Sequence, residues 1–116
     1  MKYFTEKELS CPCCGAFFME EKFQRQIDNS RRISGIPYVI NSGCRCEDHN
    51  ADVGGSDTSS HLVGWAVDVR AELDHHKFKI VKGAIMAGIT RILIYKNFIH
   101  LDSHPDKKQE IIKIME

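Results

Sequence analysis

Apolar residues recur along the chain with two kinds of spacing, and these spacings predict its helices and strands. Between residues 19 and 33, Met19, Phe23 and Ile27 recur every four positions, which predicts an amphipathic helix. A second helix is expected to start at Asp74 and to stop at Gly88, where glycine favours termination.

The second predicted helix carries large apolar residues at helical spacing. Phe78, Val81 and Ile85 are separated by three and four positions. Residues with this spacing lie on one side of a helix, so we expect the three to form its buried face.

Strand-like segments are rich in β-branched residues or alternate between apolar and polar positions. We expect strands at residues 37–41, 64–70, 92–95 and 98–102, and an edge strand within 109–115. Residues 42–60 form a long polar stretch with Gly54-Gly55, which predicts a functional or disordered loop. The order of elements predicts one α+β domain over residues 1–116, with a small, mainly antiparallel sheet and flanking helices.

The composition excludes several classes of protein. Sixteen basic residues balance sixteen acidic ones, so there is no basic excess of the kind that nucleic-acid binding usually requires. No apolar run approaches the roughly 20 residues that span a bilayer. The charged start of the chain shows no secretory signal. We therefore expect a water-soluble domain that binds no nucleic acid and has no membrane span.

Candidate metal ligands stand at His61, Asp68 and His100. Alternation places Asp68 on the sheet face opposite Val67 and Val69, and an imidazole from a neighbouring strand can join it there. Two nitrogens and one carboxylate leave a fourth tetrahedral position for water, as in catalytic zinc sites, where the pKa of that water falls towards about 7. Spacing alone also permits a structural interpretation, in which His61 caps a loop and Asp68 binds backbone amides.

The motif around these residues resembles a known family. Ser59-x-His61-x-x-Gly64-x-Ala66-x-Asp68, followed by His100-x-Asp102, is similar to the signature of the zinc D-Ala-D-Ala carboxypeptidases, which are related to phage L-alanyl-D-glutamate endolysins and to the hedgehog domain. Asn41-Ser42-Gly43-Cys44-Arg45 and Gly54-Gly55 resemble the short, single-domain members.

The resemblance implies a function and a set of roles. His61, Asp68 and His100 would bind Zn²⁺. Arg45 would grip a substrate carboxylate, which suits a planar guanidinium, and Ser59 would line the substrate pocket. The expected activity is hydrolysis of a peptide bond in the stem peptides of bacterial peptidoglycan, by a carboxypeptidase or an endopeptidase.

The chain departs from the family pattern at the proton-transfer group. Some members carry an acidic residue three positions before the last histidine ligand, or a histidine two positions earlier still, and this chain has Asn97 and Tyr95 there. Asparagine cannot accept a proton, so Asp102 or His104 is the nearest candidate. Asp102 can instead orient a ligand imidazole. The alternative function is a weakly active or inactive zinc-stabilised module that binds cell-wall peptides.

Five cysteines pose a separate question. Cys11 and Cys14 stand in C-x-x-C spacing, and Cys44 and Cys46 can approach them in the fold to form a second metal site. The other interpretation is that the thiols only pack.

The resemblance also raises a question of location. Without a visible signal we expect synthesis in the cytoplasm and action on the wall after release, by the route that phage and prophage enzymes use. We expect the domain to act as a monomer.

Overall fold

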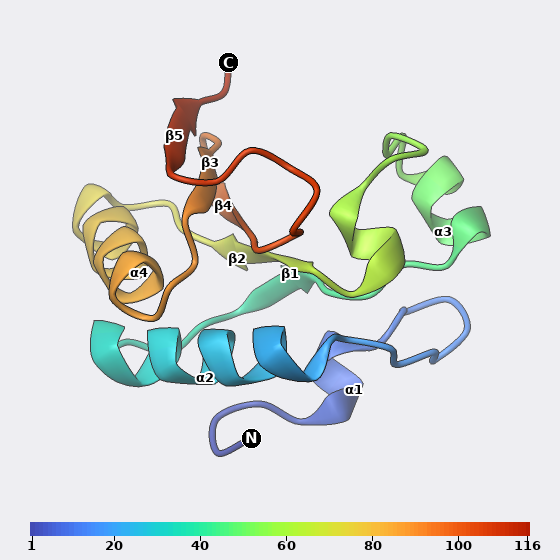
Figure 1. Ribbon diagram of the computed structural model, residues 1–116, viewed down its shortest axis with the longest axis horizontal. Coiled ribbons are helices and arrows are strands. Elements are labelled where there is room, and N and C mark those ends of the chain that lie inside the picture. The colour runs from blue at the N-terminus through green and yellow to red at the C-terminus, as the bar shows by residue number, and fades with distance from the viewer.

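The computed structural model describes residues 1–116, which fold into helices and a sheet (Figure 1). The helices are α1 (Glu6–Leu9), α2 (Glu21–Ser34), α3 (Glu47–Asp52) and α4 (Asp74–Met86), with a 3₁₀ turn, η1, at Ser60–Val63. The strands are β1 (Ile40–Ser42), β2 (Ala66–Arg70), β3 (Arg91–Ile94), β4 (Phe98–Asp102) and β5 (Ile111–Ile114).

The five strands form one sheet in the order β1-β2-β4-β3-β5. The pairs β1–β2, β2–β4 and β3–β4 are antiparallel, and only β3–β5 is parallel. The predicted α+β fold with a mainly antiparallel sheet is confirmed, and so is the edge strand near the C-terminus.

Strands β2 and β4 divide their side chains between two faces, as the alternation predicted. Val67 pairs with Leu101 and Val69 pairs with Ile99, and all four side chains are fully buried in the core. Asp68 pairs with His100 on the alternate positions. One face of this strand pair therefore supports the core, and the other carries polar chemistry.

Helices α2 and α4 pack side by side against the apolar face (Figure 1). The prediction for the buried face of α4 was wrong for two of its three residues: Phe78 and Ile85 are 67% and 48% exposed, and only Val81 packs against the core. The fully buried residues of this helix are Ile80, Gly83 and Ala84. A Cβ at Gly83 would lie 2.5 Å from the Ser30 carbonyl oxygen of α2. Small residues thus allow a close helix approach, which a pattern based on large residues does not detect.

The long polar stretch holds more regular structure than the sequence predicted. It contains α3 and leads into η1, which ends at Gly64 in the left-handed region (φ 76°). A Cβ at Gly64 would meet the Phe18 carbonyl oxygen, so glycine allows the N-terminal segment to cross this turn closely. The crossing fixes η1, which carries His61, relative to the rest of the molecule.

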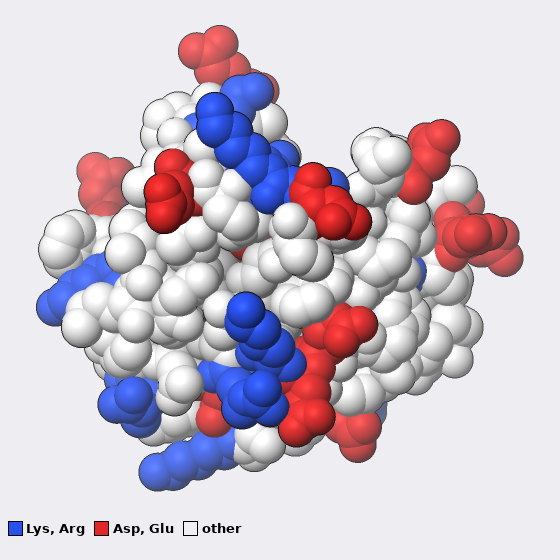
Figure 2. All heavy atoms as spheres, in the orientation of Figure 1, with Lys and Arg blue, Asp and Glu red and all other residues white.

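The surface carries charges of both signs. Basic and acidic side chains are interspersed over the face shown in Figure 2, and no broad basic area covers it. No helix has the length and apolar character needed to cross a membrane.

Candidate metal centre

Three side chains from separate elements converge on one point. His61 comes from η1, Asp68 from β2 and His100 from the neighbouring β4. The His100 Nδ1 atom lies 2.9 Å from Asp68 Oδ1, and the His61 Nε2 atom lies 3.3 Å from Asp68 Oδ2. All the potential ligand atoms lie within 4.8 Å of one another, so the group is able to hold a metal ion.

The remaining nitrogen of each imidazole has its own acceptor. His61 Nδ1 donates to the Gly43 carbonyl oxygen at 2.7 Å, and His100 Nε2 donates to Asp102 Oδ2 at 2.9 Å. Without a metal, the other two nitrogens, His61 Nε2 and His100 Nδ1, face the Asp68 carboxylate and hydrogen-bond to it. When a metal is bound, hydrogens on the outer nitrogens leave the lone pairs of His61 Nε2 and His100 Nδ1 for the ion. Ligand imidazoles in metalloproteins are oriented in this way. The donor set and its surroundings therefore fit a divalent metal such as zinc.

The carboxylates of the site are held in their ionised form. Burial opposes the ionisation of Asp68, but hydrogen bonds from His100 and His61 hold its pKa well below the usual range. Burial likewise opposes ionisation of Asp102, and contacts with His100 and the His104 amide lower the pKa of this group overall. Asp68 is thus a charged ligand at neutral pH.

Asp102 contacts His100 from the side away from Asp68. Its side chain is only 1% exposed. Oδ1 accepts the His104 amide hydrogen at 2.8 Å, while Oδ2 accepts from His100 Nε2. A buried carboxylate with both oxygens engaged is poorly placed to take a proton from a substrate or a water molecule. Of its two expected roles, this geometry favours orientation of His100.

Arg45 lies beside the metal ligands with a largely buried side chain. Nε donates to Ser42 Oγ at 2.9 Å, one terminal nitrogen to Asn50 Oδ1 at 3.2 Å, and the other to Asp68 Oδ2 at 3.3 Å. The guanidinium has five N–H groups, so one remains on each terminal nitrogen. Two such donors match the two oxygens of a carboxylate.

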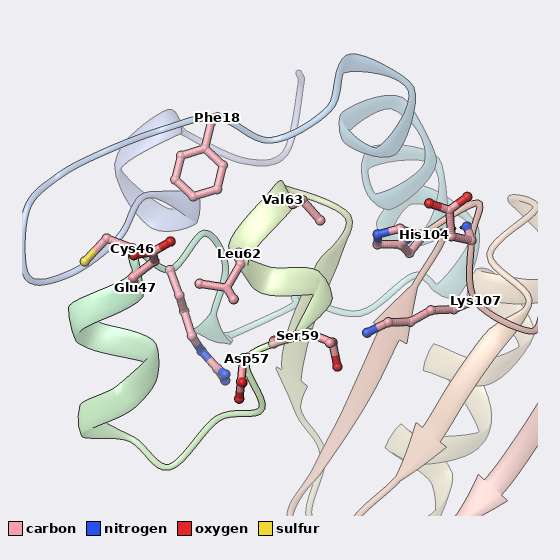
Figure 3. A pocket seen from close by; sticks show the side chains of 12 residues that line it. Phe18, Cys46, Glu47, Asp57, Ser59, Leu62, Val63, His104 and Lys107 are labelled. Carbon is pink, nitrogen blue, oxygen red and sulfur yellow. Dashed lines mark hydrogen bonds between the residues drawn. The ribbon is translucent and has the colours of Figure 1, made fainter.

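A cleft of about 580 Å³ opens next to this arginine (Figure 3). Its apolar wall is formed by Phe18, Leu62 and Val63, and its polar wall includes Ser59 and His104. In Figure 3 the segment after β4 carries His104 and Lys107 to the side of the cleft opposite Cys46 and Glu47. Arg45 also lines a second, smaller hollow of about 210 Å³ that reaches Asp68.

Ser59 has a structural contact as well as a place in the cleft. Its hydroxyl accepts the His61 amide hydrogen at 3.2 Å, which caps the η1 turn. The predicted pocket-lining residue therefore also fixes the backbone of the first ligand.

A hydrogen bond to one ring nitrogen of His104 defines the tautomer of its neutral form. Its Nδ1 accepts the Asp106 amide hydrogen at 3.1 Å, so the neutral ring carries its hydrogen on Nε2. In this tautomer the other ring nitrogen is a hydrogen-bond donor.

Asn97 and Tyr95 make no hydrogen bond to the metal ligands, although Tyr95 stacks on Phe98, which lines the smaller hollow with Asp68. Asn97 is exposed in the turn between β3 and β4, and its carbonyl oxygen accepts the Ala71 amide hydrogen. The Tyr95 ring stacks on Phe98 at a centroid distance of 4.2 Å. Both contacts are structural, and neither supplies a proton acceptor to the cleft.

The residues that hold Arg45 and His61 were not assigned roles from the sequence. Ser42, Gly43 and Asn50 stand in the quoted motif or beside it. Their function depends on a half-buried serine hydroxyl, a carbonyl oxygen and an amide oxygen that only the folded loop brings together. Asn50 is 4% exposed, and a buried asparagine indicates a role in the site. The sequence alone does not show that this residue is buried.

The cysteine prediction needs one correction. The thiols that gather are those of Cys11, Cys13, Cys14 and Cys46, whereas Cys44 is fully buried in the hydrophobic core. In an extended segment, residues two positions apart, such as Cys44 and Cys46, point to the same side. Their side chains point to different places only if the chain turns between them. The turn into α3, which has Cys46 as its N-cap, does this.

Comparison with known proteins agrees with the geometry. The family model of Peptidase M15 matches residues 2–102, which cover the sheet through β4 and every residue of the metal centre. The chain therefore belongs to the Peptidase M15 family, a family of metallopeptidases. Comparison with curated proteins gives no match.

Proposed function

We propose that the protein is a zinc peptidase that hydrolyses a peptide bond next to a D-amino acid in peptidoglycan stem peptides. The observation that carries the proposal is the adjacency of a triad with oriented imidazoles to an arginine with free N–H groups. A metal site accounts for hydrolysis, and the arginine accounts for a substrate that bears a carboxylate.

The chain would hold zinc through His61, Asp68 and His100. Bound there, zinc supplies Lewis-acid polarisation of the scissile carbonyl and activation of the attacking water. Zinc and Arg45 together exceed the negative charge of Asp68 and Asp102, so the site attracts an anionic peptide terminus.

The protein residues position the substrate and the metal ligands, and they stabilise charge that develops during hydrolysis. Arg45 binds the substrate carboxylate through its two remaining N–H groups and aligns the peptide in the cleft. His104 directs an Nε2–H donor from the cleft wall, where it stabilises negative charge that develops on the carbonyl oxygen. Asp102 acts through His100, whose ring it orients.

The test of this proposal is cleavage of defined muropeptides, followed by mass spectrometry. Stem peptides ending in D-Ala-D-Ala, cross-linked dimers, and peptides with an L-Ala-D-Glu bond distinguish the possible bonds. We expect one product set, lost with chelator and restored by zinc. His61→Ala and His100→Ala should each abolish cleavage and reduce zinc content.

The arginine is tested with a matched control. Arg45→Ala should raise KM for peptides with a free carboxylate by about tenfold or more, as the loss of a charge-assisted hydrogen-bond pair implies. Arg70→Ala removes an exposed arginine of β2 that pairs with Glu72 at 2.8 Å, and it should change neither KM nor zinc content.

One observation favours a second candidate, a cell-wall peptide-binding module. Asn97 stands where relatives carry an acidic group, and the cleft side of His104 donates a hydrogen bond. Zinc-loaded protein that binds muropeptides and cleaves none of them would establish this second function. We further propose action on the wall after release from the cell, which is tested by lysis of cells on external addition compared with internal expression.

A further inference from the structure

A second group of potential metal ligands lies outside the peptidase site. The loop after α1 carries Cys11, Cys13 and Cys14, and Figure 1 places this loop beside the start of α3, where Cys46 is the N-cap. The four sulfur atoms lie within 4.8 Å of one another. Residues 35 positions apart in sequence therefore meet at one point.

Two sulfur separations are close to those of a tetrahedral thiolate site, and a third is shorter. Zinc–sulfur bonds of about 2.3 Å in tetrahedral geometry place the sulfur atoms about 3.8 Å apart. The Cys11–Cys13 and Cys11–Cys46 separations are 3.6 and 3.7 Å, and the Cys13–Cys46 separation is 3.2 Å. Four uncoordinated thiols have no strong mutual attraction that would gather them at these distances, whereas a shared cation explains them.

The backbone around the thiols is arranged to support anionic sulfur. The Cys46 amide hydrogen points to Cys11 Sγ at 3.4 Å, and the His49 amide hydrogen points to Cys46 Sγ at 3.4 Å. The loop itself is closed by two hydrogen bonds of 2.8 Å, from the Gly15 amide to the Cys11 carbonyl and from the Cys11 amide to the Ala16 carbonyl. Gly15 adopts a left-handed conformation (φ 75°) that allows the chain to reverse there.

We propose that Cys11, Cys13, Cys14 and Cys46 bind a structural zinc ion, which fixes the segment Gly43–Cys46 and thereby positions Arg45. This inference goes beyond the proposed peptidase function, because the thiol group shares no residue with the triad, although Cys46 also lines the cleft.

The segment Gly43–Cys46 connects the two sites residue by residue. The Gly43 carbonyl oxygen accepts from His61, and the Cys44 amide donates to the Leu9 carbonyl at 2.9 Å, just before the cysteine loop. The Arg45 amide donates to the His61 carbonyl at 3.1 Å, and Cys46 belongs to the thiol group. A metal on the thiols anchors one end of this segment, so its loss frees the backbone that carries the arginine.

Metal analysis of the full-length protein is the primary test. Wild-type protein purified under reducing conditions should bind about two zinc ions per chain. The Cys14→Ser/Cys46→Ser double variant should bind one, and so should His61→Ala/His100→Ala, with the remaining ion in the other site. Cobalt-substituted wild-type protein should show thiolate-to-cobalt charge-transfer absorption, which the cysteine double variant loses and the histidine double variant keeps.

Cys44→Ala is the matched control, because this thiol lies in the core and outside the group. It should retain both zinc ions and the charge-transfer absorption. A single zinc ion in wild-type protein and the absence of charge-transfer absorption would overturn the proposal. So would a cysteine-to-cysteine disulfide in the metal-loaded protein, detected by mass spectrometry.

The positioning role has its own measurement. In the Cys14→Ser/Cys46→Ser variant, the Arg45 amide should exchange its hydrogen at least tenfold faster, while the amides of β2 and β4 stay protected. If the peptidase proposal holds, KM for a free-carboxylate peptide should rise with kcat little changed. Unchanged Arg45 exchange together with lost cobalt absorption would show a metal that does not position the arginine, and would refute that part of the inference.

Discussion

Replacement of Asp102 by asparagine separates two roles that a buried carboxylate can have beside a metal ligand. Asp102 offers two acceptors, one to the His104 amide at 2.8 Å and one to His100 Nε2 at 2.9 Å. Asparagine has almost the same shape but offers one acceptor and one donor. It cannot satisfy both neighbours as they stand.

The asparagine amide can adopt two orientations, and each of them weakens metal binding. If the amide oxygen stays with the His104 N–H, the amide NH₂ faces His100 Nε2, and the imidazole must move its hydrogen to Nδ1. That is the nitrogen that faces Asp68, 2.9 Å away, and a metal would have to displace the hydrogen. If the oxygen turns to His100 instead, two buried donors oppose each other at His104, at a cost of about 1–3 kcal/mol.

The expected result is a 10–100-fold loss of zinc affinity, as for other contacts that orient a ligand imidazole, or about 1.4–2.8 kcal/mol. Competition for zinc with a chromophoric chelator measures the affinity, and long-range nitrogen–proton correlation spectra report the His100 tautomer in metal-free protein. Asp57→Asn is the control, because Asp57 is an exposed carboxylate that lines the cleft and has no hydrogen bond to either imidazole.

The opposite pattern would refute the role assigned to Asp102. If Asp102→Asn retained wild-type zinc affinity and the wild-type His100 tautomer while kcat fell by about 10²–10⁴, Asp102 would be the proton-transfer group.

Three further predictions follow from the structure. A Cβ at Gly55 would collide with Asn50 Oδ1 and lie 3.0 Å from an Arg45 terminal nitrogen. Gly55→Ala should therefore raise KM for carboxylate peptides about tenfold, with zinc content unchanged. An unaltered KM would contradict the role of Asn50 in holding Arg45. Tyr38→Phe removes a buried hydrogen bond of 2.7 Å between the Tyr38 and Ser30 hydroxyls. The free energy of unfolding, measured by urea titration, should fall by about 1–2 kcal/mol. No loss would show that the Ser30 hydroxyl finds another partner. Burial raises the pKa of Tyr38 in the folded protein, so stability should fall as pH rises above about 10, and this alkaline loss should be smaller in the Tyr38→Phe variant.

The convergence of Asp68 and His100 could be predicted from the sequence, for a physical reason. Asp68 and His100 lie on strands, where side chains alternate strictly between two faces. Once the apolar residues Val67 and Leu101 are assigned to the core, the ligands must lie on the other face. Pairing of the two strands then brings them together.

Other features depend on contacts that the pattern of residue types does not contain. The buried face of α4 is decided by Gly83, whose missing side chain lets α2 approach, although Phe78 is the more apolar residue. Likewise Cys44 and Cys46 have the same chemistry, and only the turn into α3 decides that Cys46 joins the thiol group. The three-dimensional direction of a loop is not a periodic property of its sequence.

The pairing of Asp68 with His100 also ties metal binding to correct folding of the sheet. A slip of one residue between β2 and β4 would place Ile99 or Leu101 opposite Asp68 and send His100 towards the core. Only the native register presents two ligands on one face, so only that register gains free energy from the ion. At a free metal concentration about 1,000 times the dissociation constant, this gain is about 4 kcal/mol. Zinc present during refolding should therefore select the correctly aligned sheet over its slipped competitors, and the yield of metal-competent protein should rise with it.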